Sequence, residues 1–145
     1  MPLIFRVMCV DGNGPRCGPD ARSLGVRVPP SLDVDIEPDA AGFVQPGRGG
    51  MSVSPEAALL PIHRLPRRLK DKFPRASGSN LDAVWQMGVG AFVAGEVAAQ
   101  LVLRPDPDRP IAHGFVEPAN RMLCAEYQAA LTATRELWHR WEGDS

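Results

Sequence analysis

Short apolar runs, each closed by turn-forming residues, dominate the N-terminal half of the chain. Leu3–Val10 is rich in aliphatic side chains, contains Arg6 as its only charge, and ends at Asp11-Gly12-Asn13-Gly14-Pro15. Aliphatic and β-branched side chains suit a pleated sheet, and Asp, Asn, Gly and Pro favour turns, so this run predicts a β-strand. Two positions stay open for Arg6: burial within the sheet, or an edge strand from which its charge reaches solvent.

Apolar runs in the second half predict further strands. Ala83–Met87 forms one, and Gln100–Arg104 and Ala112–Glu117 form a β-hairpin across a proline-rich loop. Gly90–Ala98 is small and apolar, and its pattern fits either a short helix or an extended connector.

The pattern changes to helical spacing near the C-terminus. Between about Leu123 and Glu142, apolar residues recur every three or four positions and form one stripe. We therefore expect a long C-terminal helix that packs its tryptophans on the sheet. The predicted fold class is α+β, with a sheet of short, mostly antiparallel strands covered by that helix.

Composition favours one loop-rich domain over residues 1–145. This length suffices for a single core, and 15 prolines and 14 glycines imply many turns. The 16 basic and 17 acidic side chains nearly balance, which argues against a DNA-coating protein or a polybasic membrane protein.

The sequence contains no pattern typical of a metal site or of a membrane protein. Cys9, Cys17 and Cys124 are odd in number and form no CxxC pair, so we expect reduced thiols and no metal. The apolar N-terminal run is too short for a signal peptide, and no stretch is long enough to span a bilayer. We expect a protein that acts in the cytoplasm, or that leaves the cell without a cleaved signal.

Two charged segments differ in sign. Asp33, Asp35, Glu37 and Asp39 alternate with other residues in a turn-rich region, which predicts either a short acidic strand or a solvated connector. The segment from His63 to Arg75 is basic, and it could bind phosphates or an acidic partner, or could merely be solvated.

A glycine-rich turn leads into a short strand within Pro46–Pro55. The glycine pair Gly49-Gly50 permits positive φ and close approach to a ligand, and Ser52 and Ser54 are two apart, so both project to one face. A surface turn without a function would have a similar composition. The functional interpretation is a row of hydroxyl groups beside a loop rich in backbone donors.

Arg6, Ser52 and Glu117 would together support NAD-dependent ADP-ribosyl transfer. The Arg6 guanidinium offers a planar fork of donors to a phosphate or a ribose of the dinucleotide. Ser52 and Ser54 can hydrogen-bond the nicotinamide ribose, and the glycine pair would bring backbone donors to the nicotinamide amide. The Glu117 carboxylate can stabilise the oxocarbenium-like cation that forms as nicotinamide departs.

Four blocks of sequence carry a family resemblance: Leu3–Val7, Gly47–Val53, Leu101–Asp106 and His113–Met122, followed by the tryptophan-containing C-terminal segment. In this order they resemble the small cytotoxic effectors of type VI secretion that have an ADP-ribosyltransferase-like fold. The resemblance implies a split sheet that binds NAD, toxicity in the cytoplasm of a competitor, and a cognate immunity or antitoxin protein.

The resemblance also assigns residues. Arg6 matches the first-strand arginine, Ser52 the serine after the glycine pair, and His113 a histidine that opens the last strand, which adds His113 to the expected NAD-binding residues. Met51 stands where the effectors have threonine. The position of Glu117 is not regularly acidic in such toxins, so its catalytic role is our inference from the broader transferase pattern.

Two other functions fit the same residues. The chain could be a binding module that keeps the transferase fold without catalysis and grips an acidic partner through the basic segment 63–75. It could instead be a small nuclease or RNA-directed toxin that uses the same segment with His63 and His113.

Overall fold

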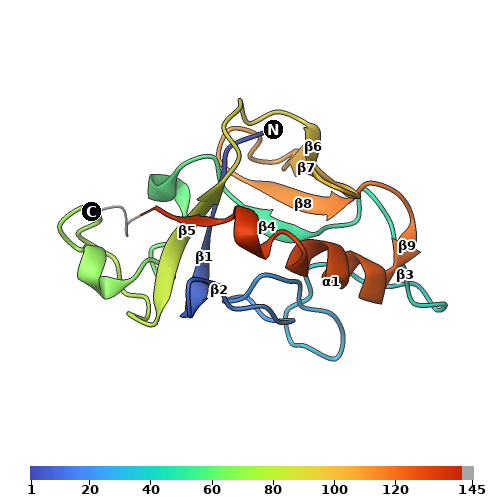
Figure 1. Ribbon diagram of the computed structural model, residues 1–145, viewed down its shortest axis with the longest axis horizontal. Coiled ribbons are helices and arrows are strands. Elements are labelled where there is room, and N and C mark those ends of the chain that lie inside the picture. Colours follow the sequence, from blue (N-terminus) through green and yellow to red (C-terminus); the bar gives the residue numbers. More distant parts are fainter. Residues whose placement is uncertain (142–145) are drawn as a thin grey trace.

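The computed structural model describes residues 1–141 and has a mixed α+β fold with mostly antiparallel strands and, within those residues, one α-helix near the C-terminal end (Figure 1). The predicted fold class is confirmed at this level. One sheet has the order β10 (His139–Arg140), β5 (Asp82–Met87), β1 (Ile4–Asp11) and β2 (Gly14–Pro15). A second sheet has the order β4 (Met51–Val53), β8 (Gly114–Pro118), β7 (Leu101–Pro105) and β6 (Gly95–Ala98).

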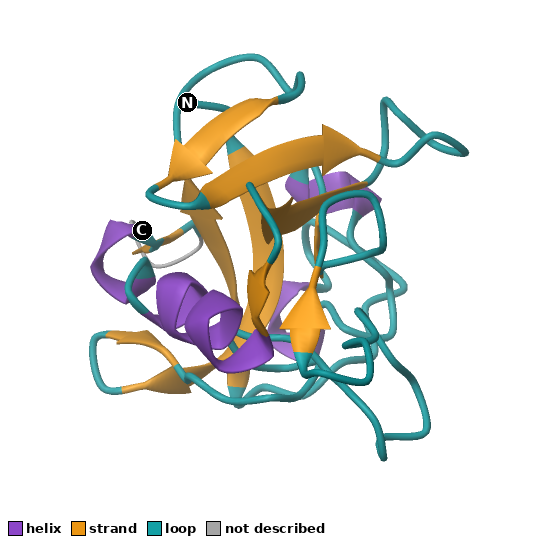
Figure 2. Cartoon of the chain, turned by 90° about the vertical axis from the view of Figure 1, so that its right-hand side faces the viewer, coloured by secondary structure: helices purple, strands orange, loops and turns teal. Residues whose placement is uncertain are grey.

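The remaining elements are short. Strands β3 (Phe43–Val44) and β9 (Met122–Leu123) form a two-stranded sheet, and the 3₁₀ helices are η1 (Ala57–Leu59), η2 (Arg67–Leu69) and η3 (Arg135–Leu137). Figure 2 shows how much of the chain is loop, in agreement with the many prolines and glycines. No helix within residues 1–141 is long and apolar enough to cross a membrane.

The predicted strands of both sheets form. Strand β1 pairs with β5 from Ile4↔Met87 to Cys9↔Asp82, and β7 pairs with β8 as the expected hairpin. The ambiguous segment Gly90–Ala98 supplies β6, which pairs with β7. Apolar runs bounded by Gly and Pro therefore located β1, β5, β7 and β8 correctly, whereas Gly90–Ala98 was expected as a short helix or an extended connector and instead contains a strand.

Strand β1 is buried on both faces, which settles the position of Arg6. Ile4 and Met8 belong to the main core, whereas Phe5 and Val7 belong to a second core on the other side of the sheet. Because side chains alternate along a strand, Arg6 points to the same side as Ile4 and Met8. Arg6 is accordingly 7% exposed.

The two sheets meet at one point. Phe5 on β1 and Ser54, just after β4, exchange backbone hydrogen bonds of 2.8 and 3.0 Å. In Figure 1 β1 and β5 run steeply across the view, whereas β4 and β8 run sideways, so the sheets diverge from this point. The divergence leaves room between them for side chains from β1 and β4.

The long C-terminal helix was predicted wrongly. Helix α1 spans only Cys124–Thr132, and the chain continues through η3 into β10, which pairs with the edge of β5. The Thr134 hydroxyl donates to the Leu131 carbonyl at 2.7 Å and accepts from the Trp138 indole at 3.0 Å. The first bond gives the Leu131 carbonyl, near the end of α1, a hydrogen-bond partner outside the helix. The exposed edge of β5 then offers its backbone groups to His139 and Arg140, which pair with it as β10 and do not continue the helix.

The two tryptophans of this segment nevertheless pack against the rest of the protein. Trp138 is buried in the main core. The ring of Trp141 lies beside the ring of Phe73, with 6.1 Å between the two ring centroids. Glu142, the last residue of the predicted helix, lies outside the described residues.

Candidate functional site

A cavity of about 260 Å³ lies where β1 and β4 meet. Four residues that the sequence singled out line it: Arg6, Ser52, Ser54 and His113. The structure therefore gathers most of the predicted site around one hollow, although the residues come from three distant parts of the chain.

Arg6 ties the two sheets and a loop together through backbone carbonyls. Its Nη1 donates to Ser52 O at 2.9 Å, and its Nε and Nη2 donate to Ser23 O at 3.2 and 2.8 Å. Nη2 also lies 3.4 Å from the carbonyls of Ala21 and Gly25. Burial lowers the pKa of Arg6 to about 10, which still leaves the guanidinium charged at neutral pH.

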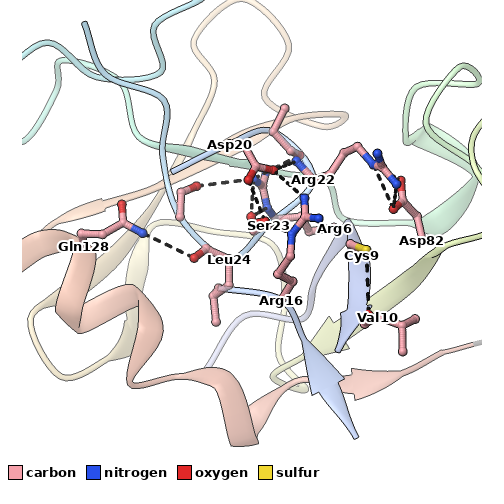
Figure 3. A network of polar contacts seen from close by, with 12 residues as sticks. Arg6, Cys9, Val10, Arg16, Asp20, Arg22, Ser23, Leu24, Asp82 and Gln128 are labelled. Carbon is pink, nitrogen blue, oxygen red and sulfur yellow. Dashed lines mark hydrogen bonds and ion pairs between the residues drawn. The ribbon is translucent and has the colours of Figure 1, made fainter. Parts of the chain in front are cut away.

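The loop that receives Arg6 is held by its own polar contacts (Figure 3). The Ser23 hydroxyl donates to Asp20 Oδ2 at 3.0 Å and accepts from Arg16 Nε at 2.8 Å. Because the Ser23 carbonyl is thereby fixed, Arg6 meets a preformed acceptor. Most of its donors are committed to the fold, and one hydrogen of Nη1 makes no bond within the described part of the chain.

Strand register places Ser52, Ser54, His113 and Glu117 on one face of the second sheet. Ser52 pairs with Phe115 and Val53 with Gly114, so Ser54 follows opposite His113. By alternation, His113, Phe115 and Glu117 point to the same side of β8. The predicted glutamate thus shares the face of the predicted serines.

Glu117 nevertheless lies beyond the end of the cavity and does not line it. Its Oε2 accepts from Arg104 Nε at 2.8 Å and from the Gly47 backbone N–H at 2.9 Å, and its side chain is 6% exposed. The Phe115 ring stands between the two ends of the face, 4.9 Å from the His113 ring and 5.0 Å from the Arg104 guanidinium.

The glycine pair packs against other backbone and does not line the cavity. Gly50 donates to Asp35 O at 3.0 Å, and a Cβ at Gly50 would meet Val116 O at 2.6 Å. Gly49 has a φ of +101°, which side-chain-bearing residues rarely adopt, and also lies against Asp35 O. The Gly50 N–H that we expected to approach nicotinamide is therefore used within the fold.

Four charged residues that the sequence did not assign to this site also line the cavity: Arg27, Asp35, Arg64 and Arg109. Arg27 Nη2 pairs with Asp35 Oδ1 at 2.9 Å, and this hydrogen bond raises the pKa of Arg27. Arg64 makes no ion pair within residues 1–141, and its charge contributes to lowering the pKa of Arg6. Four arginines thus face one carboxylate, which makes the cavity attractive to anions.

One reason explains why these charged residues were not expected at the cavity. Asp35 was interpreted as part of a solvated strand or connector, but its side chain is only 10% exposed and the next residue, Ile36, is buried in the core. Arg64 belongs to the basic segment 63–75, of which only His63 and Arg64 line the cavity. Loop residues have no periodicity, so the sequence carries no signal of which of them turns inward.

No protein-family model matches the chain, and a search of curated proteins finds no match.

Within residues 1–141, no three His, Cys, Asp or Glu side chains gather in a way that would hold a metal ion.

Proposed function

We propose that the protein is an NAD-binding domain of the ADP-ribosyltransferase type that transfers ADP-ribose to a target or hydrolyses NAD. The observation that carries this proposal is the clustering of Arg6, Ser52, Ser54 and His113 around one arginine-rich cavity between diverging sheets. A split sheet with an arginine in the first strand is what the family resemblance implies. The toxin role in a target cytoplasm, and with it an immunity partner, rests on that resemblance alone.

The cavity suits part of a dinucleotide. Ligand sites usually exceed about 300 Å³, so a cavity of about 260 Å³ would enclose one nucleoside and leave the remainder at its mouth. Arg64, which has no carboxylate partner in the described part of the chain, and Arg109, which is 64% exposed, would meet the pyrophosphate. The serine side of the cavity would bind ribose hydroxyls.

Glu117, at the edge of the site, would stabilise the cationic transition state. Its Oε2 is occupied by Arg104 and Gly47, whereas Oε1 makes no hydrogen bond with the residues described. A ribose that extends past Phe115 would bring its hydroxyls toward that oxygen, on the face that Glu117 shares with Ser52. A carboxylate there favours a cationic transition state.

Calorimetric titration with NAD tests the ligand. We expect the wild-type protein to bind NAD and Arg64→Ala to bind at least about tenfold more weakly, since a hydrogen bond between charged groups contributes about 1.5–3 kcal/mol. Arg67→Ala is the matched control, because Arg67 is exposed on η2 and does not line the cavity. Absence of binding at millimolar NAD would instead favour a non-catalytic binding module.

A second candidate, phosphodiester cleavage, is favoured by one observation: His63 and His113 line the same arginine-rich cavity. Two histidines beside cations are suited to deprotonating a hydroxyl and protonating a leaving oxygen. Cleavage of RNA by the wild-type protein, together with unchanged NAD levels in poisoned cells, would support this function over NAD chemistry.

A further inference from the structure

His113 is joined to a carboxylate that the sequence did not single out. His113 Nδ1 lies 2.9 Å from Asp106 Oδ2, and both side chains are nearly buried, with 16% and 14% exposure. The two residues stand at the base of the β7–β8 loop, where the Asp106 N–H donates to His113 O at 2.9 Å. The hairpin itself therefore brings the pair together.

The loop fixes the carboxylate as well as the imidazole. Asp106 Oδ1 accepts from the Asp108 backbone N–H at 2.9 Å, which leaves Oδ2 to His113. The Asp108 bond and the His113 bond both lower the pKa of Asp106 below its ordinary value, so the carboxylate is ionised at neutral pH. Arg109 Nε is 3.9 Å from the same Oδ2, too long for a hydrogen bond.

An ionised carboxylate on Nδ1 selects one tautomer of the ring. The proton stays on Nδ1, where Asp106 accepts it, and Nε2 is left as an acceptor. The Phe115 ring supports the imidazole from its edge. A histidine held in this way in the wall of a cavity has the features of a general base.

We propose that His113 and Asp106 form a general-base pair that activates the nucleophile in the NAD reaction. His113 is a catalytic residue and accepts the proton of the attacking water or acceptor hydroxyl at Nε2, and Asp106 is the positioning residue. This inference rests on the proposed function. It assigns the nucleophile to the His113 end of the serine face.

The proton and electron balance needs only one base. The bond from C1′ of the ribose to the nicotinamide nitrogen breaks, and its electron pair neutralises the positive charge of the pyridinium ring. Nicotinamide therefore leaves as a neutral molecule and requires no proton. The nucleophile oxygen forms the new bond to C1′, and its proton passes to Nε2 and then to solvent.

The other candidate bases of the cavity are less suited. The Asp35 carboxylate is engaged on both oxygens by Arg27, at 2.7 to 3.1 Å. His63 is exposed and has no carboxylate partner within residues 1–141. His113 alone among these groups combines a fixed tautomer with a place in the cavity wall.

Nicotinamide release by His113→Ala, Asp106→Asn and wild-type protein tests the pair. We expect His113→Ala to lower kcat by about 10² or more, as for loss of a general base, and added imidazole to restore part of the rate. Asp106→Asn should lower kcat about tenfold or more and leave KM nearly unchanged, because it alters the orientation of the base and not the binding of NAD. His139→Ala, exposed on β10, is the control and should match wild type.

The outcomes separate this inference from the proposed function. A wild-type protein that releases no nicotinamide would overturn both. Turnover in the wild type together with an unchanged kcat in Asp106→Asn, or with no imidazole rescue of His113→Ala, would overturn the base pair and leave NAD binding standing. Asp106→Asn preserves side-chain size, so it keeps the test decisive even if His113→Ala folds poorly.

Discussion

The two ends of the face shared by β4 and β8 differ in their charge balance. At one end, Ser54 and His113 border a cavity that four arginines and one carboxylate line. At the other end, Glu117 is neutralised by Arg104, and the Glu117 carboxylate also accepts from the Gly47 backbone N–H. The first end has cationic charge to offer a ligand, whereas the charges of Glu117 and Arg104 at the second end neutralise each other.

This difference separates residues that look alike in the sequence. Arg6 and Arg64 both line the cavity, but Arg6 donates to several carbonyls whereas Arg64 has no ion pair in the described chain. A buried cation with several acceptors stabilises the fold, and a cation without a partner is available to a ligand. Substitutions along this face should therefore separate fold stability from ligand binding.

Arg6→Met should give the largest effect and should act on stability. The substitution leaves the carbonyls of Ser23 and Ser52 without the donors of Arg6, and a buried carbonyl that loses its hydrogen bond typically costs about 1–3 kcal/mol, which gives about 2–6 kcal/mol for the two. The free energy of unfolding, measured in urea, should fall by about that amount, whereas Arg67→Met at the surface should change it little. A loss below about 1 kcal/mol would mean that Arg6 does not hold the sheets together.

Glu117→Gln should act on chemistry more than on the fold. Glutamine can still accept the hydrogen bonds from Gly47 and Arg104, so we expect the protein to remain folded, with a lowered melting temperature because Arg104 loses its counter-ion. Loss of the carboxylate charge should slow nicotinamide release by about 10² or more, since electrostatic groups at a transition state contribute on that scale. Undiminished turnover would remove Glu117 from the mechanism and confine catalysis to the cavity end.

The contrast also explains what the sequence could and could not predict. The strands β1, β5, β7 and β8 follow from local runs of apolar residues, and Ser52 and Ser54 share a face because side chains alternate regularly along a strand. The register of β8 against β4, however, depends on tertiary contacts. It alone determines that Glu117 lies past the cavity and not within it.

The C-terminal error has a related origin. Apolar spacing at three or four residues continued through Trp138, and this pattern does not reveal that the edge of β5 is open. Arg27 and Arg64 lie in loops, where inward orientation depends on partners far away in sequence. The periodicity of apolar residues indicates which face of a helix or strand is buried, but much of this cavity is lined by loop residues, which have no such periodicity.

Arg109→Gln should have the smallest effect, a modest loss of NAD affinity. It tests how far the positively charged end of the face extends. Arg109 is 64% exposed and its only carboxylate within the described chain, Asp106, is 3.9 Å away, so an exposed contact to phosphate is worth about 0.2–1 kcal/mol. Calorimetry should show NAD affinity reduced about two- to fivefold, with a larger difference at low salt because exposed charges are screened. Arg48→Gln, beside the glycine pair and outside the cavity, should leave affinity unchanged. Equal losses in both variants would mean that the phosphates of NAD are not confined to the cavity end of the face.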